Sequence, residues 1–279
     1  DKEDYAARLR TRIPEIDMTT GLYLSDTGIA YFYHHPEMDE DPDGPATRTI
    51  FHEATHQLFS ETRRSRRTPQ IVGQHAHFWI IEGIACYMES FAKAGDRYEL
   101  GDPLYQRFRA ARYRYLDDSY YIPLATFAEM GADEIQHAPE IRKLYSQASG
   151  LAHFFMHYGN GKYRDALIEH LSQLYSNNRN VRENPDSLPE LIGTNYKQLD
   201  EQYGEYMRAE QDKLTVQTSE KKPRAETQRR REVVAGRVCV GTHLFQAFER
   251  PLTRERIHTS PLILNKVLFS ASLRLCASH

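Results

Sequence analysis

At 279 residues, the chain is long enough to bury a substantial core in one large domain or two small ones. Its composition, with 40% hydrophobic and 27% charged residues, is typical of a soluble globular protein. It contains no run of about 18 apolar residues, so we expect no membrane-spanning segment.

The net charge of −3 hides an asymmetry along the chain. Residues 221–279 carry 12 Lys and Arg against 4 Glu, which leaves 24 basic and 35 acidic residues in 1–220. All 18 tyrosines also lie at or before Tyr206. This shift predicts a folded domain over 1–215 and a basic, poorly ordered extension over 216–279. A nucleic-acid or membrane-surface arm is the alternative interpretation of the extension.

Three cysteines, Cys86, Cys239 and Cys276, do not make a disulfide framework and indicate no redox compartment. The sequence starts at Asp1 without an apolar leader, so a cytoplasmic protein, an exported one with its leader removed and a fragment all stay open. No feature of the sequence indicates an oligomeric state.

The first 33 residues predict a short helix followed by a β-hairpin. Residues 2–11 favour a helix that Pro14 ends. Residues 21–25 and 29–33 are rich in strand formers, and the three residues between them, Asp26-Thr27-Gly28, are typical of a hairpin turn.

An H-E-x-x-H motif lies in the next predicted helix, which begins near Thr47 or Thr49 and runs to about Ser60. Four residues apart on a helix, His52 and His56 stack on one face and can reach one metal ion. Glu53 lies about 100° round from His52. It therefore flanks the metal without binding it, which suits a base acting on water.

A third ligand follows in an apolar segment, residues 79–94, for which we predict a helix ended by Gly95. Glu82 lies 26 positions after His56, far enough for the chain to return on a second helix. An exposed carboxylate is the alternative, but the apolar neighbours of Glu82 favour a ligand. The small residues Gly83 and Ala85 predict close packing of this helix on the metal helix.

The rest of the chain predicts mostly helices. We expect them at 103–116, at 123–127 as a short helix after a loop, at 144–158 with a buried face, at 163–175, and at 188–210 with an interruption at Gly193-Thr194. A hairpin-containing sheet followed by helices is the order of an α+β domain.

The motifs together resemble the gluzincin zinc metallopeptidases, in particular the bacterial peptidase-MA-like group. The likeness rests on His52-Glu53-x-x-His56 with Trp79-x-x-Glu82-Gly83-x-Ala85 and covers roughly residues 1–212. The further segments that are similar to the group are Ile122-Pro123-Leu124, Tyr145-x-Gln147-Ala148 followed by Phe154-Phe155, and Glu190-Leu191-Ile192-Gly193 with Leu199 and Tyr206.

The resemblance implies a zincin-like fold with the metal helix beneath a small sheet. It implies Zn²⁺ held by His52, His56 and Glu82, with Glu53 as general base and acid in hydrolysis of a peptide or protein substrate. A strand, residues 29–33 or its neighbour, would align the extended peptide.

The family also places a Tyr or His near the developing oxyanion. Tyr145 is the candidate, and His153 and His157 on the same predicted helix are its rivals. Where the family commonly has a carboxylate that orients a ligand histidine, this chain has Cys86. Glu89 points to the same face and could serve instead. Cys86 as a fourth ligand is the alternative to a buried, inert thiol.

Two other sequence features carry weaker signals. His75-Ala76-His77 has metal-like spacing without a third partner, and the basic cluster 63–67 is more typical of a solvated loop than of a substrate contact.

Two alternatives to hydrolysis stay open. One is a non-catalytic binding or scaffolding protein with the same fold. The other is a nucleic-acid binder that contains the motif by chance, although we expect no nucleic-acid partner.

Overall fold

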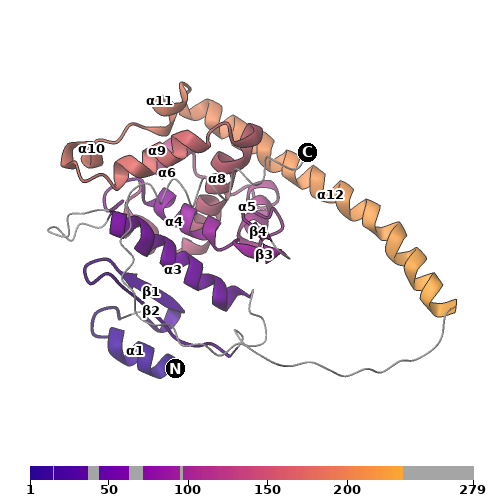
Figure 1. The fold of residues 1–279 in the computed structure, drawn as a ribbon. Coiled ribbons are helices and arrows are strands. Elements are labelled where there is room, and N and C mark those ends of the chain that lie inside the picture. Colours follow the sequence, from indigo (N-terminus) through magenta and orange to yellow (C-terminus); the bar gives the residue numbers. More distant parts are fainter. Residues whose placement is uncertain (15, 37–43, 63–71, 95–96, 235–279) are drawn as a thin grey trace.

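The computed structural model describes residues 1–14, 16–36, 44–62, 72–94 and 97–234 and contains mostly helices with two small sheets (Figure 1). The elements are α1 (Lys2–Leu9), η1 (Ile16–Met18), β1 (Gly21–Leu24), β2 (Ile29–Phe32), α3 (Pro45–Thr62), α4 (Phe78–Met88), β3 (Ala92–Ala94), β4 (Arg97–Glu99), α5 (Gln106–Leu116), α6 (Leu124–Glu129), α7 (Ala132–Gln136), α8 (Ile141–Gly161), α9 (Arg164–Leu174), α10 (Arg179–Glu183), α11 (Leu188–Ile192) and α12 (Tyr196–Val234). This mixture agrees with the α+β class.

The predicted hairpin is confirmed. β1 and β2 pair antiparallel, with Leu22 opposite Tyr31, and Gly28 in the turn has a φ of 68°, which glycine adopts without strain. α1 packs against the hairpin around a small apolar cluster of its own. The residues of that cluster are Tyr5, Ala6, Leu9, Ile16, Leu24 and Tyr33.

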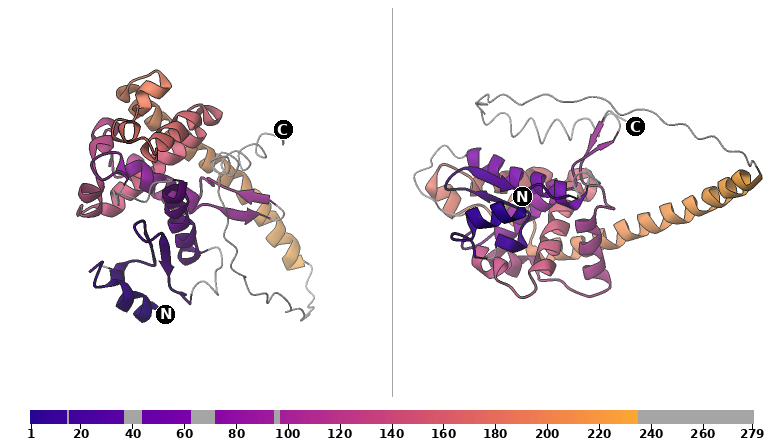
Figure 2. Two further views of the ribbon diagram at one scale, coloured as in Figure 1. Left: turned by 60° about the vertical axis from the view of Figure 1, so that its left-hand side comes forward. Right: turned by 90° about the horizontal axis from the view of Figure 1, so that it is seen from below.

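Helix α3, which carries the H-E-x-x-H motif, lies between this N-terminal part and the main helical body (Figures 1 and 2). It contacts β1 and β2 on one side and α4 on the other. The predicted helix is therefore confirmed, with Pro45 as its first residue, a position that proline tolerates because no N–H is needed there.

Helix α4 is apolar on all sides and is the centre of the main core. Every residue from Phe78 to Tyr87 is buried. A helix of this kind has to be covered all round, and α3 and α8 both pack on it.

The prediction that this helix continues to residue 94 was wrong. α4 ends at Met88, and β3 pairs with β4 in a second hairpin. The Ser90 hydroxyl donates to the Tyr87 carbonyl and accepts from the Gly101 amide. These two hydrogen bonds hold the chain after Met88 in a non-helical conformation. Apolar residues continue past this point, so periodicity alone could not locate the end.

The expected role of Gly83 also needs correction, because it faces α8 rather than the metal helix. A Cβ atom at this position would lie 2.6 Å from the carbonyl oxygen of Ala148 in α8. Glycine thus allows α4 and α8 to approach closely, and this contact sets the depth at which Glu82 lies in the core.

The later helices follow the sequence pattern. The predicted buried face of α8 is confirmed, and regular helix ends near Tyr158, where Gly159 and Asn160 take positive φ angles. Gly193 separates α11 from α12 as predicted.

α12 runs without a break across residue 216 to Val234 and extends beyond the body as a long helix (Figures 1 and 2). The change of composition therefore does not coincide with a helix end. The division into domains stays a prediction, and residues 235–279 lie outside the described part.

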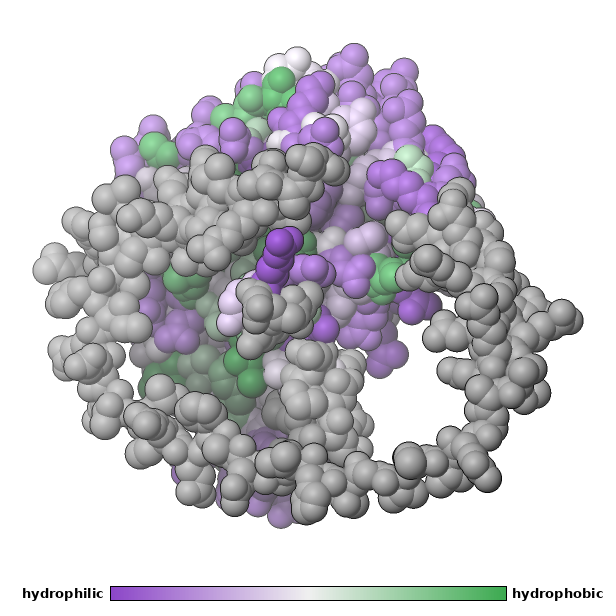
Figure 3. Space-filling model, turned by 45° about the vertical axis from the view of Figure 1, so that its right-hand side comes forward, coloured by the Kyte–Doolittle hydropathy of each residue, from purple (hydrophilic) through white to green (hydrophobic). Residues whose placement is uncertain are grey.

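On the face drawn in Figure 3, the described residues are mostly hydrophilic, with apolar residues in small groups. In the described part of the chain, no helix is both long and apolar enough to cross a membrane.

We predict that Gly83→Ala destabilises the protein. The helix propensity of alanine contributes about 1 kcal/mol in favour, but the added methyl group overlaps a backbone oxygen, and such overpacking costs about 1–3 kcal/mol. Urea denaturation followed by circular dichroism measures the difference. A midpoint equal to that of the wild type would show that α4 and α8 separate at no cost.

Candidate metal centre

Three side chains from two helices converge on one point. Nε2 of His52 lies 3.2 Å from Nε2 of His56 and 3.3 Å from Oε2 of Glu82, and Oε1 of Glu82 lies 3.7 Å from Nε2 of His56. The histidines come from successive turns of α3 and the carboxylate from α4. All three side chains are largely buried, with Glu82 only 8% exposed.

A hydrogen bond on the far side of His52 fixes its tautomer. Nδ1 of His52 lies 2.9 Å from Oε1 of Glu89. An ionised carboxylate can only accept, so Nδ1 carries a proton, and in the neutral ring Nε2 presents a lone pair. That lone pair faces Nε2 of His56 and the carboxylate of Glu82, which are also electron-pair donors. A shared cation, either a proton or a metal ion, stabilises such a group.

The geometry fits a metal ion. Ligand atoms about 2.0–2.1 Å from a tetrahedral ion lie about 3.3 Å from one another, close to the three separations in this group. His52, His56 and Glu82 are therefore grouped closely enough to hold a metal ion.

The electrostatics of the group agree with that fit. Burial would raise the pKa of Glu82, but the charge of His56 and hydrogen bonds from both histidines outweigh it and lower the pKa well below its usual range. Burial would lower the pKa of His52, but contacts with Cys86, Glu82 and Glu89 raise it well above its usual value. Both shifts indicate a place that favours positive charge.

Glu89 is itself held in position by α5 and the residue before it. The Tyr105 hydroxyl donates to Oε2 of Glu89 at 2.7 Å, and the Arg107 guanidinium donates to both carboxylate oxygens at 2.9 and 2.8 Å. Burial would raise the pKa of Glu89, but the hydrogen bond from His52 and the charge of Arg107 lower it to about 2. Glu89 thus stays ionised and anchors the ring of His52.

Arg48 completes this support from α3. Its guanidinium donates to the main-chain oxygen of Glu89 at 2.8 Å and lies over the ring of Tyr105, 4.9 Å from the ring centroid. Arg48 lies one turn before His52, on the same side of the helix, so helical spacing could have identified it.

A second donor group, His52, Cys86 and Glu89, lies behind the first and shares His52 with it. It is a poor metal site because Arg107 already neutralises Glu89 there. Burial raises the pKa of the Cys86 thiol, which favours its neutral form. Cys86 is not grouped with His56 and Glu82, so the expectation of an inert, buried thiol fits better than that of a fourth ligand.

Glu53 lies beside the metal group and is bonded to the N-terminal hairpin. Its Oε2 accepts from the main-chain N–H of Tyr23 in β1 at 2.9 Å. Glu53 is 9% exposed and borders the same cleft as the two histidines. It thus flanks the group as helical spacing predicts, and the strand fixes its direction.

Tyr145, in the first turns of α8, borders the same cleft and interacts with Glu82. Burial, together with the charge of Glu82, raises the pKa of its phenol well above 10, so the hydroxyl keeps its proton.

The two rival histidines on α8 face other partners. His153 contacts the carbonyl of Gly101 and the hydroxyl of Tyr206, and Nε2 of His157 lies 2.8 Å from the hydroxyl of Tyr87. Neither borders the cleft.

The cleft has a volume of about 320 Å³ and brings the N-terminal hairpin to the metal group. Of the two strands, β1 borders it, through Gly21, Leu22 and Tyr23. Its opposite walls include Phe78, Ile81 and Tyr175, so apolar surface lies next to the polar cluster.

The H-x-H sequence does not join this centre. His77 caps α4 with a φ of 62° and packs against His170, with ring centroids 4.9 Å apart. Within the described residues, neither His75 nor His77 belongs to a group that could hold a metal. The basic cluster 63–67 lies outside the described residues.

The sequence identified the grouped residues His52, His56 and Glu82. It also identified Glu53 and Tyr145 beside them, and it indicated Glu89 as a partner for a ligand histidine. It missed Tyr105, Arg107 and the amide of Tyr23, because those contacts depend on where α5 and β1 lie relative to α3.

Searches against protein families, curated proteins and solved structures found no match to this chain.

We predict that Glu89→Gln weakens metal binding about 10–100-fold, the usual effect of losing a charged partner of a ligand histidine. Glutamine keeps a hydrogen-bond acceptor for Nδ1 but removes the negative charge that supports His52. Competition with a fluorescent zinc chelator measures the affinity. Glu61→Gln, an exposed carboxylate in the last turn of α3, is the matched control. Equal affinities for the two variants would contradict the role of Glu89.

Proposed function

We propose that the protein is a zinc-dependent peptidase that hydrolyses peptide bonds in the cleft between β1 and α3. The observation that carries the proposal is the convergence of His52, His56 and Glu82 at tetrahedral ligand spacing, with Glu53 beside them. The resemblance to gluzincin metallopeptidases, noted from the motifs, supports the same conclusion.

The donor set favours zinc among common metal ions. Two imidazoles and one carboxylate are typical of catalytic zinc sites, which leave a further position for water or substrate. Magnesium and calcium prefer oxygen ligands alone, so two histidine nitrogens disfavour both. Bound zinc would act as a Lewis acid on the substrate carbonyl and would make water a stronger acid.

Glu53 is the general base in this proposal. Its carboxylate takes a proton from the attacking water and then delivers that proton to the amine nitrogen of the leaving group. The hydrogen bond from the Tyr23 N–H to Oε2 leaves Oε1 of Glu53 for this task and holds the carboxyl group at one angle.

The shape of the cleft suits an extended peptide. β1 runs along one wall beside Glu53, and an added strand is a common way for a sheet to bind a peptide. The apolar side chains of Phe78 and Ile81 on the other wall would accept a hydrophobic side chain near the scissile bond.

We predict that Glu53→Gln keeps zinc and loses peptidase activity by at least about 10²-fold, since a general base contributes roughly 10²–10⁴ in rate. Zinc content by mass spectrometry and cleavage of a peptide library, each with and without chelator, measure the two effects. Gln57→Ala, one turn later on α3, controls for changes in the helix. Full activity of Glu53→Gln would rule out this mechanism.

Tyr145 has two possible roles, which its substitution by phenylalanine separates. If the phenol donates to the oxyanion, we expect kcat to fall by about 10²–10³ with zinc affinity unchanged. If it mainly orients Glu82, zinc affinity falls instead. We predict the first result, because Tyr145 borders the cleft. If Tyr145→Phe keeps both the kcat and the zinc affinity of the wild type, Tyr145 has no role in the site.

The alternative function is binding without turnover. Bound zinc with no cleavage across the library, in wild-type protein, would favour a scaffolding or binding role over hydrolysis.

A further inference from the structure

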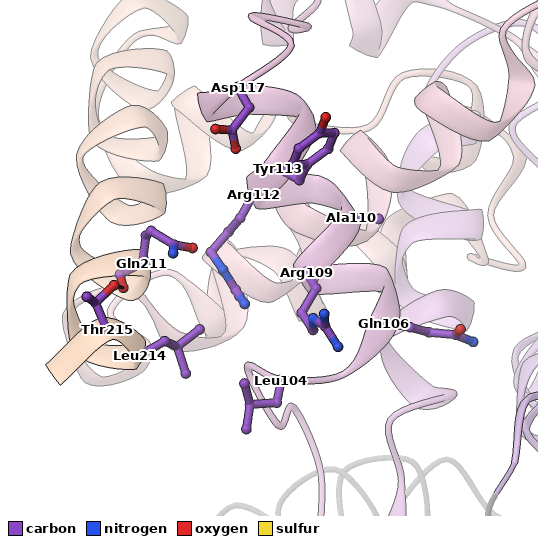
Figure 4. Close-up of a pocket in the computed structure, with 10 residues that line it drawn as sticks. All are labelled: Leu104, Gln106, Arg109, Ala110, Arg112, Tyr113, Asp117, Gln211, Leu214 and Thr215. Carbon is purple, nitrogen blue, oxygen red and sulfur yellow. Dashed lines mark hydrogen bonds between the residues drawn. The ribbon is translucent and has the colours of Figure 1, made fainter. Parts of the chain in front are cut away.

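A larger cavity lies on another part of the molecule, between α5 and α12. Its volume is about 710 Å³. Figure 4 shows Arg109 and Arg112 extending from α5 toward this space, with Gln211 and Leu214 of α12 on its other side. It shares no lining residue with the cleft at the metal group.

Helical spacing places a polar stripe of each helix on this cavity. On α5 the residues are Gln106, Arg109, Arg112 and Tyr113, and on α12 they are Gln211, Leu214 and Thr215. Residues three and four positions apart share one helix face. The opposite face of α5, with Phe108 and Ala111, packs into the core.

Arg112 is unusual because it is buried while one nitrogen of its guanidinium group has no hydrogen-bond partner. Its side chain is 4% exposed, and its Nε has no hydrogen-bond partner. Within the described residues, no carboxylate forms an ion pair with it. The buried carboxylate of Glu210 pairs instead with Lys213, at 2.7 Å.

A buried, unpaired guanidinium is costly, and proteins normally provide an opposite charge for it. Burial lowers the pKa of Arg112 most; the negative charge of Glu210 acts against this effect, and the positive charge of Arg109 adds to it. Two cations thus repel each other at the edge of one cavity. Asp117 at the far end is exposed and makes no ion pair with either arginine among the described residues.

Large apolar side chains also line the cavity. Leu104 is 51% and Tyr113 58% exposed, and both border the cavity with Leu214. Large apolar side chains that stay exposed around a buried charge are typical of a ligand site rather than of an ordinary surface.

We infer that this cavity binds an organic oxyanion, a carboxylate or phosphate group carrying an apolar substituent, with Arg112 and Arg109 on the anion and the leucines on the substituent. This site is independent of the proposed hydrolysis. An arginine fork matches both anions with two parallel hydrogen bonds.

Isothermal titration calorimetry of the full chain tests the inference, with inorganic phosphate, hexanoate and hexylammonium as probes at one ionic strength set with sodium chloride. We expect hexanoate or phosphate to bind and hexylammonium, with the same alkyl chain and the opposite charge, not to bind. Tighter binding of hexanoate than of phosphate would identify a carboxylate ligand, and the reverse order a phosphate.

Two variants locate the site. Arg112→Met should weaken anion binding about tenfold or more, as for loss of a charged hydrogen bond. It should also leave the melting temperature of the free protein equal or higher, since it removes a buried N–H group that has no hydrogen-bond partner. Arg109→Gln, at an exposed position that folding tolerates, should weaken binding about threefold.

Arg208→Gln is the charge control, because Arg208 is an exposed arginine of α12 that does not line the cavity. It should bind anions as the wild type does. The inference is overturned if neither anion binds more tightly than chloride, if hexylammonium binds equally well, or if Arg109→Gln keeps wild-type affinity.

Discussion

The hydrogen bond between His52 and Glu89 is the interaction on which the candidate site depends. It joins α3, which carries two of the grouped residues, to the end of α4, which carries the third. Tyr105 and Arg107 extend the link to α5. Because Glu89 can only accept, it directs Nε2 of His52 toward His56 and Glu82, and that direction allows the three side chains to hold a metal ion together.

The burial of α4 is the constraint behind this geometry. A helix that is apolar all round must be buried on every side, because exposing any of its faces to water would cost hydrophobic free energy. Glu82 is carried into the core with it and lies where an ionised carboxylate is tolerated only beside a cation. Close packing on α8 through Gly83 then fixes the carboxylate opposite the histidines. A stabilising helix thus holds a group that is unfavourable on its own.

Helix α5 connects the two polar regions of the molecule. One side supplies Arg107 to Glu89, and another presents Arg112 to the cavity beside α12. The two regions differ in charge, since the carboxylates of Glu53 and Glu82 lie at the first and the guanidinium groups of Arg109 and Arg112 at the second. In each, groups of one character lie near each other, an arrangement that a bound ion of the opposite charge would stabilise.

The sequence by itself determined the local parts of this protein. The spacing of His52 and His56 requires only one helix, and the turn at Gly28 and the helix break at Gly193 depend on backbone preferences of single residues. The apolar setting of Glu82 was enough to indicate a buried ligand. Tertiary structure decided what depends on the relative position of elements. The end of α4 at Met88 and the contact of Gly83 with α8 follow from the packing of the helices. The same is true of β1 beside Glu53, of Arg107 at Glu89, and of Arg112 near α12. These contacts join residues distant in sequence, and no local pattern encodes them because each is set by how the buried faces of separate helices fit together.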